Sequence, residues 1–369
     1  MNESNEYLDD LNMVMRKYYK ILSPEFPEWL TDYIKTPEML RLKGISQACG
    51  TDYVKLYMHW DFYDVLEHSI GCALIVWNFT KDKKQTLAAL FHDISTPVFK
   101  HCIDFLDGDY EKQESTEGLT APMIKNSMEI MELLKRDGIK LEEVCDYHIY
   151  PIADNDSPRL SSDRLEYTFM NGHKMNYGIW FSPVDIKEIY EDIEVQVNED
   201  GIPELVFKTL DIAEKFVYMS SILWPNWCDN RYKLVAQFYA DTVKRLGELG
   251  ELTREDLYRY SEKDVIWLMN NSSDEELSKT FKLFQEVTYF HESDVKPSDD
   301  KYCVSFNCKK RYLNPLVNIN GEYKRIYDVS QIVKEIIDEF LNYETPKYAY
   351  FDFNFKDNKQ NYVKRKKLY

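Results

Sequence analysis

Hydrophobic positions recur at helical spacing along most of the chain. The longest apolar run lies at 65–77, where it is interrupted only by Glu67, His68, Ser69 and Gly71. Apolar residues also recur at intervals of three or four over further stretches: 85–94, 121–136, a segment beginning near Asp163, 184–193, 209–223, 229–248, 253–270 and 274–288. This spacing places one face of each segment against a core and predicts a mainly α-helical fold.

The pattern changes after about residue 290. Residues 302–306, 316–319 and 348–355 alternate β-branched or aromatic residues with polar ones, which is typical of strands. Asn320-Gly321 is a hairpin signal, and a helix is expected at 329–342. The sequence therefore predicts a helical domain over 1–290 and a small α+β appendage over 291–369.

Charge and composition narrow the class of partner. The chain has 369 residues, of which 44% are hydrophobic and 30% charged, as in ordinary globular proteins. Its net charge of −18 repels polyanions, so duplex nucleic acid is not expected as a partner. A small phosphorylated substrate remains compatible with this charge, because a metal ion and a few basic side chains can reverse the potential inside one pocket.

The cysteines and the N-terminal residues indicate in which cellular compartment the protein is expected. Seven cysteines form no CxxC pair, and Cys72 lies in an apolar run, where a free thiol acts as a small hydrophobe. The first residues are polar and acidic, unlike a signal peptide, and no run reaches the roughly 18 apolar residues of a membrane span. We expect a cytoplasmic protein that does not enter a membrane.

Four residues form the strongest chemical pattern in the chain. His92 and Asp93 are adjacent at a predicted helix end, His68 lies on an otherwise apolar helix, and Asp163 begins another helix after Ser161-Ser162. Taken singly, each has a simple structural interpretation. Together they make a mixed nitrogen and oxygen ligand set, which suits a divalent Mn, Fe, Ni, Co, Zn or Mg ion.

The segments around these residues resemble a known family. They are Arg41 to Gln47 followed by Tyr53, Leu66-Glu67-His68-Ser69-Ile70-Gly71, Leu90-Phe91-His92-Asp93-Ile94 with Phe99-Lys100-His101, and Asp163-Arg164-Leu165-Glu166-Tyr167. The motif core 41–170 resembles the HD-domain metal-dependent phosphohydrolase superfamily, closest to its deoxynucleoside-triphosphate triphosphohydrolase-like branch. The resemblance implies an HD-domain helical bundle, with His68, His92, Asp93 and Asp163 as metal ligands.

The chain departs from that branch at three positions. Val65, Thr96 and Gln113 stand where the nucleotide hydrolases often have an arginine and two histidines. We therefore look elsewhere for the groups that act on the substrate. The predicted catalytic residues are Asp93, His101 and Glu114, and the predicted substrate contacts are Gln47, Lys112, Arg164 and Tyr167. His59 and His173 are expected to be structural.

The function predicted from these residues is metal-dependent hydrolysis of a nucleotide or a related phosphate ester through a metal-activated water. One alternative is a metal-binding regulatory or interaction module of HD fold without turnover, which the three departures favour. Another is oxygen-dependent cleavage at a di-iron site, for which only His101 and His148 lie between His92 and Asp163. The resemblance also makes a homo-oligomer an expectation.

Overall fold

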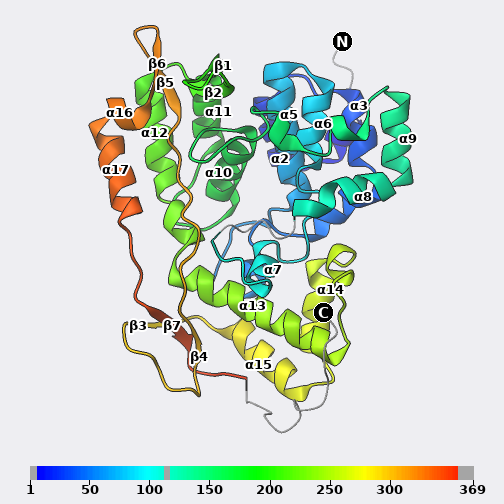
Figure 1. Ribbon diagram of the computed structural model, residues 1–369, viewed down its shortest axis with the longest axis vertical. Helices are drawn as coiled ribbons and strands as arrows, with labels where there is room; N and C mark the ends of the chain where they lie inside the picture. The colour runs from blue at the N-terminus through cyan, green and yellow to red at the C-terminus, as the bar shows by residue number, and fades with distance from the viewer. Residues whose placement is uncertain (1–5, 112–116, 356–369) are drawn as a thin grey trace.

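The computed structural model describes residues 6–111 and 117–355, which form a helical body joined to two small sheets (Figure 1). The helices are α1 (Glu6–Asp10), α2 (Met13–Leu22), α3 (Glu28–Ile34), α4 (Pro37–Leu40), α5 (Val65–Thr80), α6 (Lys83–Phe91), α7 (His101–Leu106), α8 (Thr120–Asn126), α9 (Met128–Arg136), α10 (Ser162–Lys174), α11 (Pro183–Glu191), α12 (Leu210–Ser221), α13 (Asn230–Leu249), α14 (Glu262–Asn270), α15 (Glu275–Glu286), α16 (Ile326–Val329) and α17 (Gln331–Leu341). The mainly helical prediction is confirmed for this part of the chain.

The strands form two separate sheets. They are β1 (Ile193–Val197), β2 (Pro203–Phe207), β3 (His291–Ser293), β4 (Tyr302–Val304), β5 (Leu316–Ile319), β6 (Glu322–Arg325) and β7 (Tyr348–Phe351). The first sheet has the order β1-β2-β5-β6 and the second the order β3-β7-β4. The predicted hairpin at Asn320-Gly321 joins β5 and β6, and both turn residues have positive φ, as a tight hairpin requires.

Three details differ from the sequence prediction. The helix expected at 121–136 is two helices, α8 and α9, because the chain turns at Ser127, whose side chain accepts a hydrogen bond from Ile130 N and caps α9. The helix expected at 253–270 is regular only from Glu262. The antiparallel hairpin β1–β2 was not predicted; the burial of its residues does not alternate, and four consecutive residues of β2, Glu204 to Phe207, are buried.

The first sheet joins the two predicted domains. Strand β2 of the helical part pairs in parallel with β5 of the appendage, with Val206 opposite Leu316. Helix α17 packs on α12, and β4 and β7 pack on α13. The division at residue 290 stays a prediction, but strand pairing and helix packing both cross it.

The helical body has a buried helix at its centre. Helix α5 packs against α6, α10 and α2, and eleven of its residues are buried, among them Ile70, Ala73 and Leu74. A capping box between Asp64 and Glu67 fixes its N-terminus. The helix therefore has little freedom to move relative to its neighbours, and it holds any functional side chain on it in a defined place.

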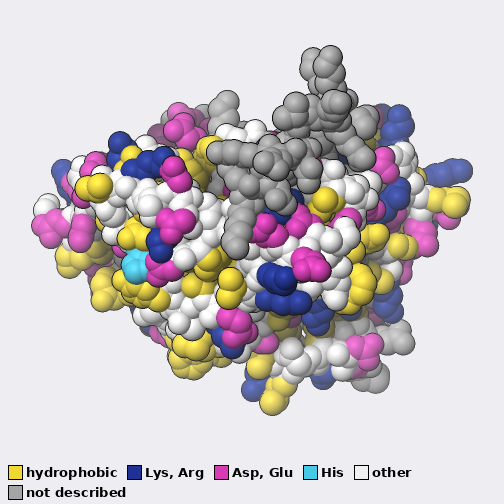
Figure 2. Space-filling model, turned by 90° about the horizontal axis from the view of Figure 1, so that it is seen from below, with side chains coloured by type: hydrophobic (Ala, Val, Ile, Leu, Met, Phe, Trp, Pro, Cys, Tyr) yellow, Lys and Arg dark blue, Asp and Glu magenta, His cyan; other side chains and the backbone are white. Residues whose placement is uncertain are grey.

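The face of the molecule seen in Figure 2 carries charged side chains of both signs. Seen from below, Lys and Arg side chains lie interspersed with Asp and Glu (Figure 2). Among the described residues, none of the helices has the length and apolar character needed to cross a membrane. The cytoplasmic location stays a prediction.

Candidate metal centre

Three packed helices bring the four predicted ligands together. His68 projects from α5, His92 and Asp93 follow the last residue of α6, and Asp163 lies in the first turn of α10. The Ser161 side chain accepts a hydrogen bond from Arg164 N and so fixes the start of α10, as the sequence predicted. Because α5 packs against both other helices, ligands 95 positions apart in the sequence meet at one point.

The facing ligand atoms are separated by distances that suit one ion. His68 Nε2 lies 3.1 Å from His92 Nε2 and 3.0 Å from Asp163 Oδ1. Asp163 Oδ1 is 3.7 Å from His92 Nε2, and Asp93 Oδ2 lies 3.9 Å from His68 Nε2 and 3.7 Å from His92 Nε2. Ligands at about 2.1 Å from a common ion, at right angles to one another, would be about 3.0 Å apart. The donor set therefore fits a divalent ion.

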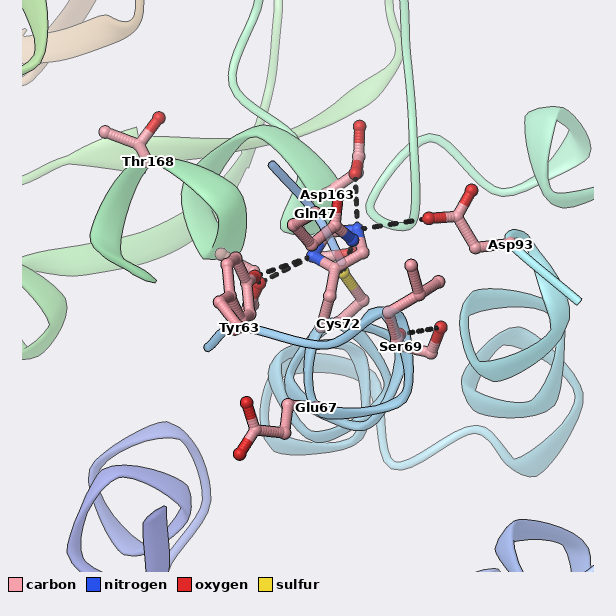
Figure 3. A network of polar contacts seen from close by, with 12 residues as sticks. Gln47, Tyr63, Glu67, Ser69, Cys72, Asp93, Asp163 and Thr168 are labelled. Atoms are coloured by element: carbon pink, nitrogen blue, oxygen red, sulfur yellow. Dashed lines mark hydrogen bonds and ion pairs between the residues drawn. The ribbon is translucent and has the colours of Figure 1, made fainter. Parts of the chain in front are cut away.

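Both imidazole rings are held with Nε2 directed into the centre. His92 Nδ1 lies 2.7 Å from the Ala89 carbonyl oxygen, to which it donates. His68 Nδ1 lies 2.6 Å from Glu166 Oε2, to which it donates. Figure 3 shows Tyr63, Asp93 and Asp163 joined by dashed lines to one ring at the centre. Because Nδ1 is engaged in each ring, Nε2 is the atom that would bind a metal, after losing the proton with which it otherwise bonds Asp163.

Charge in the centre keeps its carboxylates ionised. Burial alone would raise the pKa of Asp163, but hydrogen bonds from His68 and His92 outweigh burial and hold that pKa well below its ordinary value. Burial likewise opposes ionisation of Asp93, but the positive charge of Lys100, followed by those of His92 and His68, holds the Asp93 pKa below its ordinary value. An ionised carboxylate is the form that binds metal.

Glu166 supports His68 from a fully buried position. Its side chain is 0% exposed, its Oε1 accepts from Tyr18 OH at 3.0 Å, and Tyr63 OH donates to its Oε2. A Cβ added at Gly71 would lie 2.6 Å from Cγ of Glu166, so only glycine leaves room for this carboxylate. Sequence reasoning did not assign Glu166 a role. Its place three residues after Asp163 on α10 was the available signal.

Lys100 is a second residue of the site that sequence reasoning missed. Its Nζ lies 3.0 Å from Asp93 Oδ2 and 2.5 Å from Gln47 Oε1. Phe99 and Lys100 both have positive φ, which turns the chain back over the centre before α7 begins. The segment Phe99-Lys100-His101 belonged to the resemblance, but nothing in its residue types showed that the lysine reaches Asp93.

Cys72 lies beside the centre, one helical turn after His68. Its Sγ is 3.7 Å from both ring nitrogens of His68, and with His68, His92 and Asp163 it forms a group whose ligand atoms lie within 4.8 Å of one another. Burial raises the pKa of the Cys72 thiol, so the thiolate that binds metal is disfavoured. This agrees with the interpretation of Cys72 as a small buried hydrophobe.

The metal centre opens into a cavity of about 470 Å³. Five residues predicted from the sequence to act on the substrate line it: Gln47, Asp93, His101, Arg164 and Tyr167. The Gln47 amide nitrogen is buried, and no acceptor among the described residues reaches it. Tyr167 packs edge-on against Trp227, with ring centroids 5.4 Å apart. Lys112 and Glu114, also predicted, lie outside the described residues, as does Gln113.

Arg164 holds the loop that covers the cavity. Its Nε donates to the Arg159 carbonyl at 2.7 Å, its Nη2 to the Asn155 side chain at 2.7 Å, and its Nη1 lies 2.9 Å from Asp154 Oδ1. Asp154, Asn155 and Arg159 all line the cavity. These contacts show Arg164 organising the loop, while its predicted contact to the substrate stays a prediction.

The remaining predicted histidines separate into two kinds. His101 Nδ1 lies 2.9 Å from Asp104 Oδ2, and its side chain lines the cavity. His59 contacts Thr51 Oγ1 at 2.8 Å, and His173 Nδ1 donates to the Phe181 carbonyl at 2.8 Å; neither lines the cavity. Val65 is fully buried in the core, so it offers no polar group at the position where the branch that the chain resembles often has an arginine.

The chain has distant relatives in sequence among known proteins. No protein-family profile matches the chain. It is 22% identical over 320 residues to the uncharacterized protein YdhJ of Bacillus subtilis, covering 83% of this chain and 89% of that protein. It is also 22% identical over 305 residues to a protein of Cordyceps militaris named metal-dependent phosphohydrolase cns2, covering 79% of this chain and 81% of that protein.

Solved structures share the fold. A hypothetical protein from Aquifex aeolicus superposes with a TM-score of 0.61 at 18% identity, covering 89% of this chain and 93% of that one. A protein from Bacteroides thetaiotaomicron named phosphohydrolase superposes with a TM-score of 0.60 at 14% identity, covering 88% and 96%. One relative in sequence and one structural neighbour are thus named phosphohydrolases, and His68, Cys72, His92 and Asp163 lie close enough in this structure to hold a metal ion.

Proposed function

We propose that this protein is a metal-dependent phosphohydrolase that acts on a nucleotide or a related phosphate ester. The observation that carries the proposal is the convergence of His68 Nε2, His92 Nε2 and Asp163 Oδ1, with Asp93 beside them, at the wall of one cavity. A divalent ion held by these four residues would supply Lewis-acid chemistry and would lower the pKa of a water bound to it.

The residues around the ligands supply positioning and charge. Lys100 orients the Asp93 carboxylate and adds positive charge where a phosphate would lie. Gln47 accepts a hydrogen bond from Lys100, which leaves its buried amide nitrogen as a donor for a substrate oxygen or for water. In this proposal the pair takes the place of the phosphate-binding groups that are missing at Val65 and Thr96.

His101 is the proposed group for proton transfer to or from the substrate. Its Nδ1 is engaged by Asp104, so Nε2 is the ring atom that remains for exchange with the substrate or with water. Burial lowers the pKa of His101, which makes the protonated ring a stronger acid. The predicted roles of Glu114, Lys112, Arg164 and Tyr167 stay part of the proposal.

Phosphate release tests the proposal. The purified chain would be screened against nucleotides and simple phosphate esters with Mn²⁺, Ni²⁺, Co²⁺, Mg²⁺ and Fe²⁺, beside a His92→Ala variant. We expect release of phosphate, pyrophosphate or triphosphate that depends on the metal and disappears in the variant. Bound metal without turnover on any substrate would instead support the regulatory module of HD fold.

A further inference from the structure

A segment outside the motif core completes the wall of the cavity. Residues 305–315, here called the strap, connect β4 to β5 without regular secondary structure and run along the molecule as the orange trace of Figure 1. Lys309 and Arg311 from this strap line the cavity. Lys310 between them is directed away, with its Nζ 2.7 Å from the Leu341 carbonyl oxygen and above the Phe340 ring.

Contacts on either side of Lys309 and Arg311 hold the strap in place. Cys308 Sγ lies 3.9 Å from the carbonyl oxygen of Trp227, which is itself a cavity residue. Asn314 N donates to the Pro158 carbonyl at 2.8 Å, which ties the strap to the loop that carries Arg159. Arg311 is therefore held between two anchors, as a residue that determines specificity must be.

A buried ion pair supports the second anchor. Both Arg325 Nη atoms contact the Glu204 carboxylate, at 2.6 and 2.8 Å, and Glu204 is 0% exposed. Glu204 also accepts from Leu160 N at 3.3 Å, and Arg325 donates to the Asn314 carbonyl at 3.1 Å. The pair thus joins the strap to the loop over the cavity.

Arg311 and Lys100 bring positive charge to the cavity from different segments of the chain. Lys100 is the positive charge that most strongly lowers the Asp93 pKa at the metal centre. Burial lowers the pKa of His101, and the charges of Arg311 and Lys100 lower it further, against the hydrogen bond with Asp104. Burial raises the pKa of Tyr167 to about 12, and the charges of Arg164 and Arg311 oppose that increase. Arg311 therefore adds positive charge, from the strap, to the part of the cavity that His101 and Tyr167 line.

We propose that Arg311, assisted by Lys309, determines specificity by binding a second anionic group of the substrate, while the phosphoryl group to be cleaved lies at the metal centre. The preferred substrates are then phosphate compounds with at least two anionic groups. This inference rests on the proposed function. An arginine suits the role because its planar guanidinium can hold a phosphate or carboxylate through two parallel hydrogen bonds.

Binding of two non-hydrolysable probes tests the inference. Methylenediphosphonate has two anionic groups and methylphosphonate has one. Each would be titrated calorimetrically into the full-length chain as purified, with metal content measured before and after. The proteins would be wild type, Arg311→Ala, Arg311→Lys and Lys310→Ala. Lys310 is the matched control, because it carries the same charge one position away and faces Leu341.

We expect Arg311→Ala to weaken methylenediphosphonate binding about tenfold or more, and methylphosphonate binding by less than about twofold. Arg311→Lys should bind methylenediphosphonate with intermediate affinity, because lysine keeps the positive charge but cannot form the two parallel hydrogen bonds of a guanidinium. Lys310→Ala should bind both probes as wild type does. Equal losses for both probes in Arg311→Ala, no loss in it, or the same loss in Lys310→Ala would overturn the inference. Failure of the proposed function would appear separately, as a chain without metal or without phosphate release.

Discussion

His68 Nδ1 lies 2.6 Å from Glu166 Oε2, and the carboxylate is 0% exposed. Two tyrosine hydroxyls, of Tyr18 and Tyr63, donate to the same carboxylate. The two tyrosines therefore hold the Glu166 carboxylate in the position where its Oε2 accepts from the His68 ring. A carboxylate behind a metal-binding histidine fixes the ring's tautomer and orientation and raises its basicity.

Glu166→Gln tests this relationship. A glutamine has one acceptor oxygen in place of the two of the carboxylate. Its NH2 group would face either Tyr18 or the His68 and Tyr63 side, where the carboxylate now accepts hydrogen bonds. We expect affinity for Mn²⁺ to fall about tenfold to a hundredfold while the protein stays folded. A titration against a competing chelator measures the affinity. Glu286→Gln, at an exposed position, is the control. Unchanged affinity in Glu166→Gln would show that the pair has no role in metal binding.

Gly71→Ala tests the packing that leaves room for Glu166. The added Cβ would lie 2.6 Å from Glu166 Cγ, and crowding of this kind typically costs about 1–3 kcal/mol. Alanine's better helix propensity offsets only about 1 kcal/mol of it. Thermal unfolding should therefore show a lower Tm. Gly118→Ala, where the added Cβ meets nothing within 4 Å, should leave Tm unchanged. A Gly71→Ala protein as stable as wild type would contradict this account.

Lys100→Met separates metal binding from turnover. Lys100 Nζ lies 3.0 Å from Asp93 Oδ2, where its positive charge also repels a cation. We therefore expect the variant to bind Mn²⁺ at least as tightly as wild type. Phosphate release should fall about a hundredfold, because a preorganised positive charge beside the substrate is lost. Loss of the metal together with turnover would mean that Lys100 serves only to build the metal centre.

We predict that mild acidification lowers the free energy of unfolding, because His59 is buried in its neutral form. Burial, with a further effect from Arg231, lowers the His59 pKa to about 4 from an ordinary value of 6.5. Between these values the unfolded chain binds more protons than the folded one, so stability is lost as the pH falls from about 6.5 to about 4. The loss attributable to this group is roughly 1–3 kcal/mol.

His59→Gln should remove that part of the pH dependence. Urea unfolding of wild type and variant at pH 7 and pH 5 would measure it, because the free energy of unfolding extrapolates to water at each pH. We expect the variant to lose less stability than wild type on acidification. The same loss in both proteins would show that His59 titrates normally in the folded state.

The four candidate ligands could be proposed from the sequence because the segments around them resemble a known family. His68 and Asp163 lie on predicted helices, and His92 and Asp93 directly follow one. Ser161 likewise allowed the start of α10 to be predicted, because serine is a common N-cap residue. Helix starts and ends of this kind can be recognised from nearby residues alone, without knowledge of how the helices pack.

The supporting residues depend on packing, which the pattern does not encode. Lys100 reaches Asp93 only because Phe99 and Lys100 adopt positive φ, a conformation that their residue types do not favour. Arg311 reaches the cavity from a segment about 150 residues beyond Asp163, through a strap with no regular structure. The β1–β2 hairpin was missed because its two strands have five residues each, too few to change the helical interpretation of their surroundings.

Metal content is the measurement that tests the central claim most directly. Elemental analysis would be made on purified wild type, His92→Ala, Asp163→Ala and His173→Ala, with helix content followed by circular dichroism. His173 is the control, because it lies on α10 with its Nδ1 bonded to the Phe181 carbonyl and does not line the cavity. The account predicts about one divalent ion per chain in wild type and His173→Ala, and none in the other two proteins, with helix content preserved in all four. Full metal occupancy in both His92→Ala and Asp163→Ala, or no metal in wild type, would contradict it.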